Sequence, residues 1–102
     1  MRLISLQSGS NGNCVYVEAG TQRLLFDAGI SGKSAVSRLA GHGRDIRNVD
    51  SVFISHDHSD HVMSLGIFQR KFDLPGVVSG KTLNAAKQHC DLGRLGHIRT
   101  FD

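Results

Sequence analysis

Five side chains that can bind a metal ion fall within six consecutive residues: His56, Asp57, His58, Asp60 and His61. Neutral imidazoles and carboxylates are ligands that Zn²⁺ and similar ions prefer. Because alternate residues of an extended segment point to the same side, His56 and His58 can converge on one ion while Asp57 points elsewhere. We interpret Asp57 as a solvated or loop-bonding carboxylate. The spacing predicts a metal site, and the alternative is a histidine-rich surface loop without metal.

The cluster lies between two predicted elements that can hold it rigidly. Residues 52–54 are an apolar run typical of a short buried strand, and residues 62–72 have the pattern of an amphipathic helix. Asp60 and His61 fall where the chain turns into that helix, so they can face a second ion. A metal site whose ligands lie between the end of a strand and the start of a helix is held rigidly, because both elements are fixed by packing.

Short elements also alternate along the rest of the chain. Strands are predicted at 3–6, 15–18 and 23–26, in close succession, which indicates an antiparallel start. Helices are predicted at 31–40, capped by Ser31, and at 82–90, with a short strand at 77–78 between them. This alternation predicts the α/β class. The residues expected to face inward are Ala35, Val36, Leu39 and Ala40 in the first helix, and Leu83, Ala86 and Cys90 in the last.

The length of 102 residues predicts one domain, spanning 1–102. No apolar run approaches the ~20 residues that span a bilayer, and the N-terminus does not resemble a signal peptide, so we expect a cytoplasmic protein without membrane contact. Cys14 and Cys90 are isolated from each other, as is typical of reduced structural thiols. The net charge of +3 and the pI of about 9.2 mildly favour anionic partners such as nucleic acid.

Four segments carry a resemblance to a known family. Residues 56–61 (HDHSDH) match the His-x-His-x-Asp-His signature, so the chain resembles the metallo-β-lactamase-fold metallo-hydrolases. Residues 24–29 (LLFDAG) resemble the first motif of that superfamily, a buried strand that ends in an aspartate. Residues 8–13 (SGSNGN) and 68–75 (FQRKFDLP) are most similar to the WalJ-type (YycJ-like) branch, whose members are similar to DNA exonucleases and phosphodiesterases.

The resemblance implies a fold that this chain supplies only in part. The family has an αββα sandwich, and we expect the chain to form its first half, a mixed sheet with flanking helices. Members of the family are longer and have three further metal motifs downstream, so the chain is expected to be an N-terminal fragment. The uncovered apolar face of a half-sandwich predicts that the isolated chain is unstable, aggregates or self-associates.

The resemblance also implies roles for the clustered residues. His56 and His58 would hold a first ion, and Asp60 and His61 a second, which gives one or two divalent metal ions. Zinc is favoured, with manganese as the alternative. Asp60 would also orient the attacking water, which makes it the expected catalytic residue.

Two further segments have both a structural and a functional interpretation. Asp27 ends a predicted strand, where a buried carboxylate needs partners. The resemblance favours a role in fixing the motif histidines over a plain helix or turn cap. The glycines between Ser8 and Asn13 allow backbone N–H groups to line up as an anion nest, and the alternative is a tight strand connection. The polar side chains of this possible substrate loop are Ser8, Ser10, Asn11 and Asn13.

These features predict a metal-dependent hydrolase that, when full-length, acts as a phosphodiesterase or DNA exonuclease. The alternative is a catalytically inactive, metal-binding fragment that lacks the downstream ligand motifs, so whether this chain is itself an enzyme stays open. A histidine-aspartate phosphohydrolase also fits the local spacing, but such sites occur in all-helical folds, and the strand-rich first half argues against it.

Overall fold

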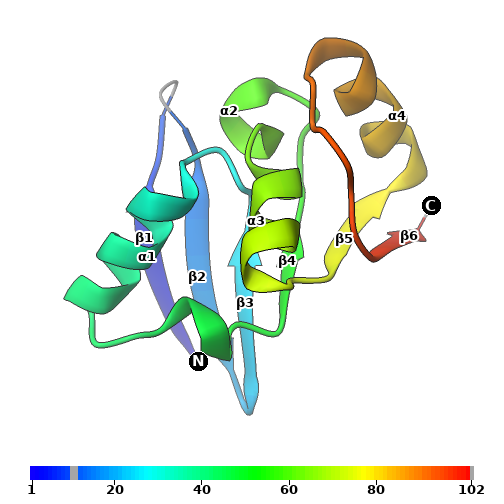
Figure 1. The fold of residues 1–102 in the computed structure, drawn as a ribbon. Coiled ribbons are helices and arrows are strands. Elements are labelled where there is room, and N and C mark those ends of the chain that lie inside the picture. The colour runs from blue at the N-terminus through cyan, green and yellow to red at the C-terminus, as the bar shows by residue number, and fades with distance from the viewer. Residues whose placement is uncertain (10–11, 102) are drawn as a thin grey trace.

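The fold is built on one six-stranded mixed sheet, seen in a computed structural model that describes residues 1–9 and 12–101 (Figure 1). Neighbouring strands in the sheet are also consecutive in the chain. The two pairings among the first three strands are antiparallel, and the other three pairings are parallel. The strands are β1 (Arg2–Gln7), β2 (Cys14–Ala19), β3 (Gln22–Phe26), β4 (Ser51–Phe53), β5 (Gly76–Ser79) and β6 (Ile98–Phe101). The predicted α/β class and antiparallel start are confirmed.

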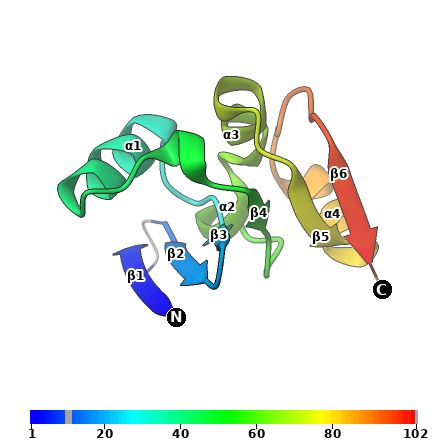
Figure 2. The ribbon, with the colours of Figure 1, turned by 90° about the horizontal axis from the view of Figure 1, so that it is seen from below.

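Four α-helices and a 3₁₀ turn are described, and none of these helices is long and apolar enough to cross a membrane. Helices α1 and α3 cover one face of the sheet (Figure 2). Helices α2 and α4 lie beyond the edge where β4 and β5 end (Figure 1). The elements are α1 (Gly32–Gly41), η1 (Ile46–Asn48), α2 (Ser59–Val62), α3 (Leu65–Phe72) and α4 (Gly80–His89).

Helix α1 confirms the predicted cap and half of the predicted inward face. The Ser31 hydroxyl accepts a hydrogen bond from the Ser34 backbone N–H at 3.1 Å, as an N-cap does. Ala35 and Leu39 are fully buried. The inward placement of Val36 and Ala40 is wrong, because these residues line an open groove beside Phe72 of α3.

The single helix predicted for residues 62–72 is wrong, because the chain forms α2 and α3 with a break at Met63 and Ser64. In an uninterrupted helix, the carbonyls of Asp60 and His61 would accept from the amides four residues later. Here the Asp60 carbonyl accepts from the Asn13 N–H at 2.6 Å, and the His61 carbonyl accepts from the Ala28 N–H at 2.6 Å. Tertiary hydrogen bonds therefore replace helical ones.

Helix α4 begins two residues earlier than predicted, where the Ser79 hydroxyl accepts from the Thr82 backbone N–H at 3.1 Å. Ala86 is buried, and Leu83 and Cys90 are half-buried, in agreement with the predicted inward face.

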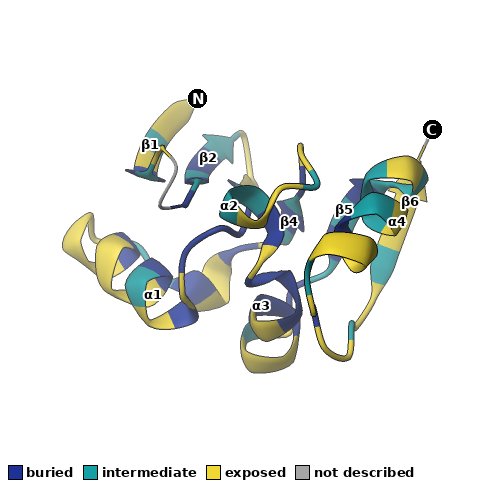
Figure 3. Cartoon of the chain, turned by 90° about the horizontal axis from the view of Figure 1, so that it is seen from above, coloured by how far each residue is buried: buried dark blue, intermediate teal, exposed yellow. Residues whose placement is uncertain are grey.

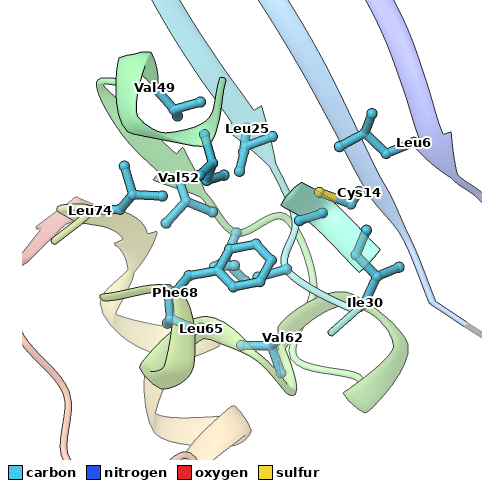
Figure 4. Close-up of a cluster of buried hydrophobic side chains, with 14 of the residues drawn as sticks. Leu6, Cys14, Leu25, Ile30, Val49, Val52, Val62, Leu65, Phe68 and Leu74 are labelled. Atoms are coloured by element: carbon cyan, nitrogen blue, oxygen red, sulfur yellow. The ribbon is translucent and has the colours of Figure 1, made fainter. Parts of the chain in front are cut away.

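The core lies between the sheet and helices α1 and α3. Leu25 of β3 and Val52 of β4 are neighbours in the sheet, and both pack in one cluster with Leu65 and Phe68 of α3 (Figure 4). All four side chains are fully buried. The outer surfaces of α1 and α3 are exposed, while their inner surfaces are buried (Figure 3). This core fixes β3 and β4 relative to α3, and so fixes both ends of the loop that contains the histidine motif.

Cys14 belongs to this core, and we predict that its thiol is unreactive in the folded protein. Desolvation by burial, with the charge of Asp27 nearby, raises the pKa of Cys14 from 9.0 to about 12. At pH 8, iodoacetamide is expected to modify the half-buried Cys90 and to leave Cys14 unmodified until denaturant is added, as peptide mass spectrometry can show. The native state keeps a proton that the unfolded chain loses, so stability should fall as the pH rises from about 9 to about 12. Rapid native modification of Cys14 would contradict this placement.

The face of the sheet turned away from α1 and α3 has an apolar row of its own. Val15, Phe26, Phe53 and Val77 are successive partners across β2 to β5, and all four are half-buried. The rings of Phe26 and Phe53 stack with centroids 5.2 Å apart. Among the described residues no helix covers this face of the sheet (Figure 2), which agrees with the expected open face of a half-sandwich.

We predict that the isolated 102-residue chain self-associates through this row. Sedimentation velocity should show species larger than a monomer, because apolar area buried between copies is stabilising. Replacing Phe26 and Phe53 with threonine should shift the distribution toward monomer, whereas replacing the exposed Ile67 on α3 should not. A wild-type chain that is monodisperse, monomeric and cooperatively melting would show the prediction to be wrong.

Candidate metal centre

The histidine motif meets Asp27 because β3 and β4 are parallel neighbours. Parallel strands end at the same edge of a sheet, so the residues that follow Phe26 and Phe53 lie side by side. The Asp27 backbone N–H donates to the Phe53 carbonyl at 2.6 Å. The chain then runs through Ser55 to His58, which occupies the N-cap position of α2.

The Asp27 carboxylate is the buried centre of a hydrogen-bond network. The residue is 8 % exposed and has a left-handed backbone conformation, with φ of +72°. Its carboxylate accepts from the Ser55 backbone N–H at 2.7 Å and from the Ser55 hydroxyl at 2.7 Å. It also lies 2.8 Å from Nδ1 of His61. Since a carboxylate only accepts, Nδ1 of His61 carries the proton, and in the neutral ring Nε2 carries none.

Ser55 extends this network to the other histidine. The Ser55 hydroxyl gives its single proton to Asp27, so it can only accept from Nδ1 of His56, which lies 2.7 Å away. Asp27 therefore orients His61 directly and His56 through Ser55, and in both neutral rings Nε2 carries no proton. Sequence reasoning assigned no role to Ser55. The signal available was its place between a buried strand and the first motif histidine.

These side chains make a set of donors that suits a divalent cation. One ligand atom from each of Asp27, His56 and His61 can be chosen so that all three lie within 4.8 Å of one another. The two imidazole rings have centroids 4.4 Å apart. Two neutral imidazoles beside a carboxylate fit Zn²⁺ and also Mn²⁺.

The other two predicted ligands lie close by but outside this three-residue group. His58 is exposed, and it lines a pocket of about 430 Å³ together with Asp60, Cys90 and His89 of α4. Oδ2 of Asp60 lies 3.6 Å from Nε2 of His61. The ligand roles of all four motif residues stay predictions. Asp57, interpreted as solvated or loop-bonding, has Oδ2 3.5 Å from Nε2 of His89.

The possible substrate loop is described only in part. Ser8 is exposed near the start of the loop, and Asn13 is half-buried against Asp60 at its end. Ser10 and Asn11 lie outside the described residues.

Comparison with known proteins identifies the family. A model described as "Metallo-beta-lactamase superfamily" matches residues 8–92, which include Asp27 and the whole histidine motif. The chain belongs to the metallo-beta-lactamase superfamily. Members of this superfamily bind divalent metal ions, in agreement with the donor set that follows the ends of β3 and β4.

Two curated relatives carry exonuclease names. Exodeoxyribonuclease YycJ of Bacillus anthracis is 42% identical over 80 residues, which cover 78% of this chain and 30% of the relative. Exodeoxyribonuclease WalJ of Streptococcus pneumoniae is 39% identical over 90 residues, which cover 88% of this chain and 34% of the relative. The chain thus spans about a third of the length of these relatives.

Solved structures of the superfamily have the same fold at low sequence identity. A B3 metallo-beta-lactamase with an active-site glutamic acid has a TM-score of 0.80 and is 12% identical in sequence. The match covers 98% of this chain and 42% of the lactamase chain. The short form of human tRNase Z has a TM-score of 0.66 and 15% identity over 96% of this chain and 44% of its own. The predicted metallo-β-lactamase sheet with flanking helices is confirmed.

Proposed function

We propose that the full-length protein is a metal-dependent phosphodiesterase that shortens DNA as an exonuclease. The observation that carries this proposal is the arrangement of His56 and His61 around Asp27, in a chain of a hydrolase superfamily. The substrate class is supported by the exodeoxyribonuclease names of both relatives. The net charge of +3 agrees with an anionic substrate.

Each motif residue has a proposed role. Nε2 of His56 and a ring nitrogen of His58 would hold a first ion, and Asp60 and Nε2 of His61 would hold a second. Asp60 also accepts a hydrogen bond from the water that attacks the phosphodiester, and so orients it. A bound divalent ion, zinc or alternatively manganese, would supply Lewis-acid activation and neutralise charge at phosphorus. Asp27 fixes the proton positions of both rings, and exposed Ser8 is the described side chain of the loop that can face the substrate.

We predict that the full-length protein purifies with one or two equivalents of metal, measured by mass spectrometry. His56→Ala and His61→Ala are each expected to lower the content by about one equivalent, because each removes an oriented imidazole. His58→Ala tests whether that residue joins the site despite its exposed position. His42→Ala is the matched control, since His42 is exposed at the end of α1. Unchanged metal content in both the His56 and His61 variants would contradict the proposed site.

The reaction is tested with DNA labelled at one end, in single-stranded and double-stranded form, before and after treatment with a chelator. Stepwise shortening that stops with the chelator and resumes with added Zn²⁺ or Mn²⁺ is the expected result. A chromogenic β-lactam serves as the comparison substrate. Bound metal without hydrolysis of DNA or of simple phosphodiesters would favour the non-catalytic metal-binding alternative.

A further inference from the structure

The side-chain amide of Asn13 connects the loop that precedes β2 with the start of α2. Its Oδ1 accepts from the Gly9 backbone N–H at 3.1 Å, and its Nδ2 lies 2.9 Å from the Gly9 carbonyl oxygen. The same Nδ2 lies 3.1 Å from the Asp60 backbone oxygen and 3.1 Å from Oδ2 of Asp60. It also lies 3.4 Å from Nε2 of His61. A single amide thus reaches both the backbone and the carboxylate of the expected catalytic residue.

The backbone of Asn13 holds the same two segments together. The Asn13 N–H donates to the Asp60 carbonyl at 2.6 Å, and the Asn13 carbonyl accepts from the Gly29 N–H at 3.0 Å. A Cβ atom at Gly29 would stand 1.8 Å from the Asp60 carbonyl oxygen, so only glycine allows this approach. The position of Asp60 relative to the turn after β3 is therefore fixed by close contacts on two sides.

The orientation of the Asn13 amide follows from its neighbours. Three oxygen atoms surround Nδ2, while a backbone N–H faces Oδ1, so the reverse orientation would place oxygen against oxygen. Within residues 1–9 and 12–101, Nδ2 of Asn13 is the one amide that donates to the Asp60 carboxylate. That carboxylate is 29% exposed, and its Oδ2 stays 3.6 Å from Nε2 of His61.

We propose that Asn13 is a positioning residue that holds the Asp60 carboxylate beside Nε2 of His61, so that the two groups can bind one divalent cation. The inference rests on the proposed function only in taking Asp60 and His61 as metal ligands. It replaces the expectation that the Asn13 side chain faces substrate, because the amide is already satisfied inside the protein.

The test is a double-mutant cycle on Zn²⁺ affinity in the full-length protein. Asn13→Ala, Asp60→Ala and the double variant are titrated with Zn²⁺ in competition with a fluorescent chelator, and unfolding of the metal-free proteins is followed separately. Loss of a partner that orients a metal ligand typically weakens binding about 10–100-fold, so we expect Asn13→Ala to weaken the site next to His61 by that factor. In the Asp60→Ala background the same substitution should change affinity less than about twofold, because its target is gone.

A purely structural role predicts the opposite pattern. If Asn13 only stabilised the loop, Asn13→Ala would weaken Zn²⁺ binding equally in both backgrounds, and that result, or no weakening at all, overturns the proposal. Asn13→Ser keeps a polar side chain at this position but is too short to reach Oδ2 of Asp60, so it should repeat the loss if Asn13→Ala does not fold. Asn84→Ala, at an exposed position of α4, is the matched control. The assay needs no DNA, so it is independent of the proposed reaction. If the effects of Asn13→Ala and Asp60→Ala on Zn²⁺ affinity are coupled but the protein has no nuclease activity, this inference holds and the proposed function is refuted.

Discussion

Replacing Asp60 with asparagine is expected to lower kcat/KM for DNA hydrolysis by the full-length protein about 10²–10⁴-fold, the range for a positioned group that handles a proton in the reaction. The substitution keeps the shape of the side chain and an oxygen that can accept from Asn13, but it removes the negative charge beside Nε2 of His61. The fold should remain intact, because Asp60 is partly exposed and its backbone contacts to Asn13 are unaffected. Steady-state kinetics on end-labelled DNA, with circular dichroism for the fold, measures both.

The matched control for this substitution is Asp73→Asn. Asp73 is an exposed carboxylate at the end of α3, and asparagine tolerates its left-handed φ of +56°. This variant should keep wild-type kinetics. If Asp60→Asn also keeps them, Asp60 has no catalytic role, and the proposed assignment of the motif is wrong.

Replacing Asp27 with alanine is expected to have the largest effect on stability. Removing the buried carboxylate leaves the Ser55 N–H, the Ser55 hydroxyl and Nδ1 of His61 without their acceptor. Losing hydrogen bonds to a charged group, together with alanine in a left-handed conformation, should lower the free energy of unfolding by about 2–5 kcal/mol. Metal affinity should fall about 10–100-fold, because neither His56 nor His61 keeps the contact that orients its ring. Denaturant titration of the metal-free protein and chelator competition measure the two effects.

Two milder variants separate the functions of this network. Asp27→Asn keeps a side chain that tolerates positive φ and one acceptor oxygen, so it should lose less stability than Asp27→Ala. Ser55→Ala removes the hydroxyl that donates to Asp27 and contacts His56, but it keeps the Ser55 backbone N–H and His61 contacts of Asp27, so it should weaken metal binding with a smaller loss of stability. Equal metal affinity in wild type, Asp27→Ala and Ser55→Ala would show that the network is not needed to orient the ligands.

The local sequence pattern predicted helices and strands correctly where the spacing of apolar side chains and the capping residues indicate the same element. The three opening strands, the cap at Ser31 and the helix that ends near Cys90 follow from alternation, N-cap chemistry and apolar spacing. The pattern failed at residues 62–72, because their apolar stripe continues across Met63 and Ser64 while the carbonyls of Asp60 and His61 bond to distant amides. It also failed at Val36, because apolar spacing does not tell whether a neighbouring helix covers that side.

Residue types and their spacing alone showed that a motif rich in histidine and aspartate follows a buried strand, and that an aspartate ends an earlier strand. Residue type and spacing within a few positions were enough for that, since both are local properties. The contacts of Asp27 with His61 directly and with His56 through Ser55, and the hydrogen bond of Asn13 to Asp60, 47 residues away, could be seen in the folded chain alone. These contacts depend on β3 and β4 being parallel neighbours and on the close approach at Gly29, which arise from packing of the whole sheet rather than from any local pattern.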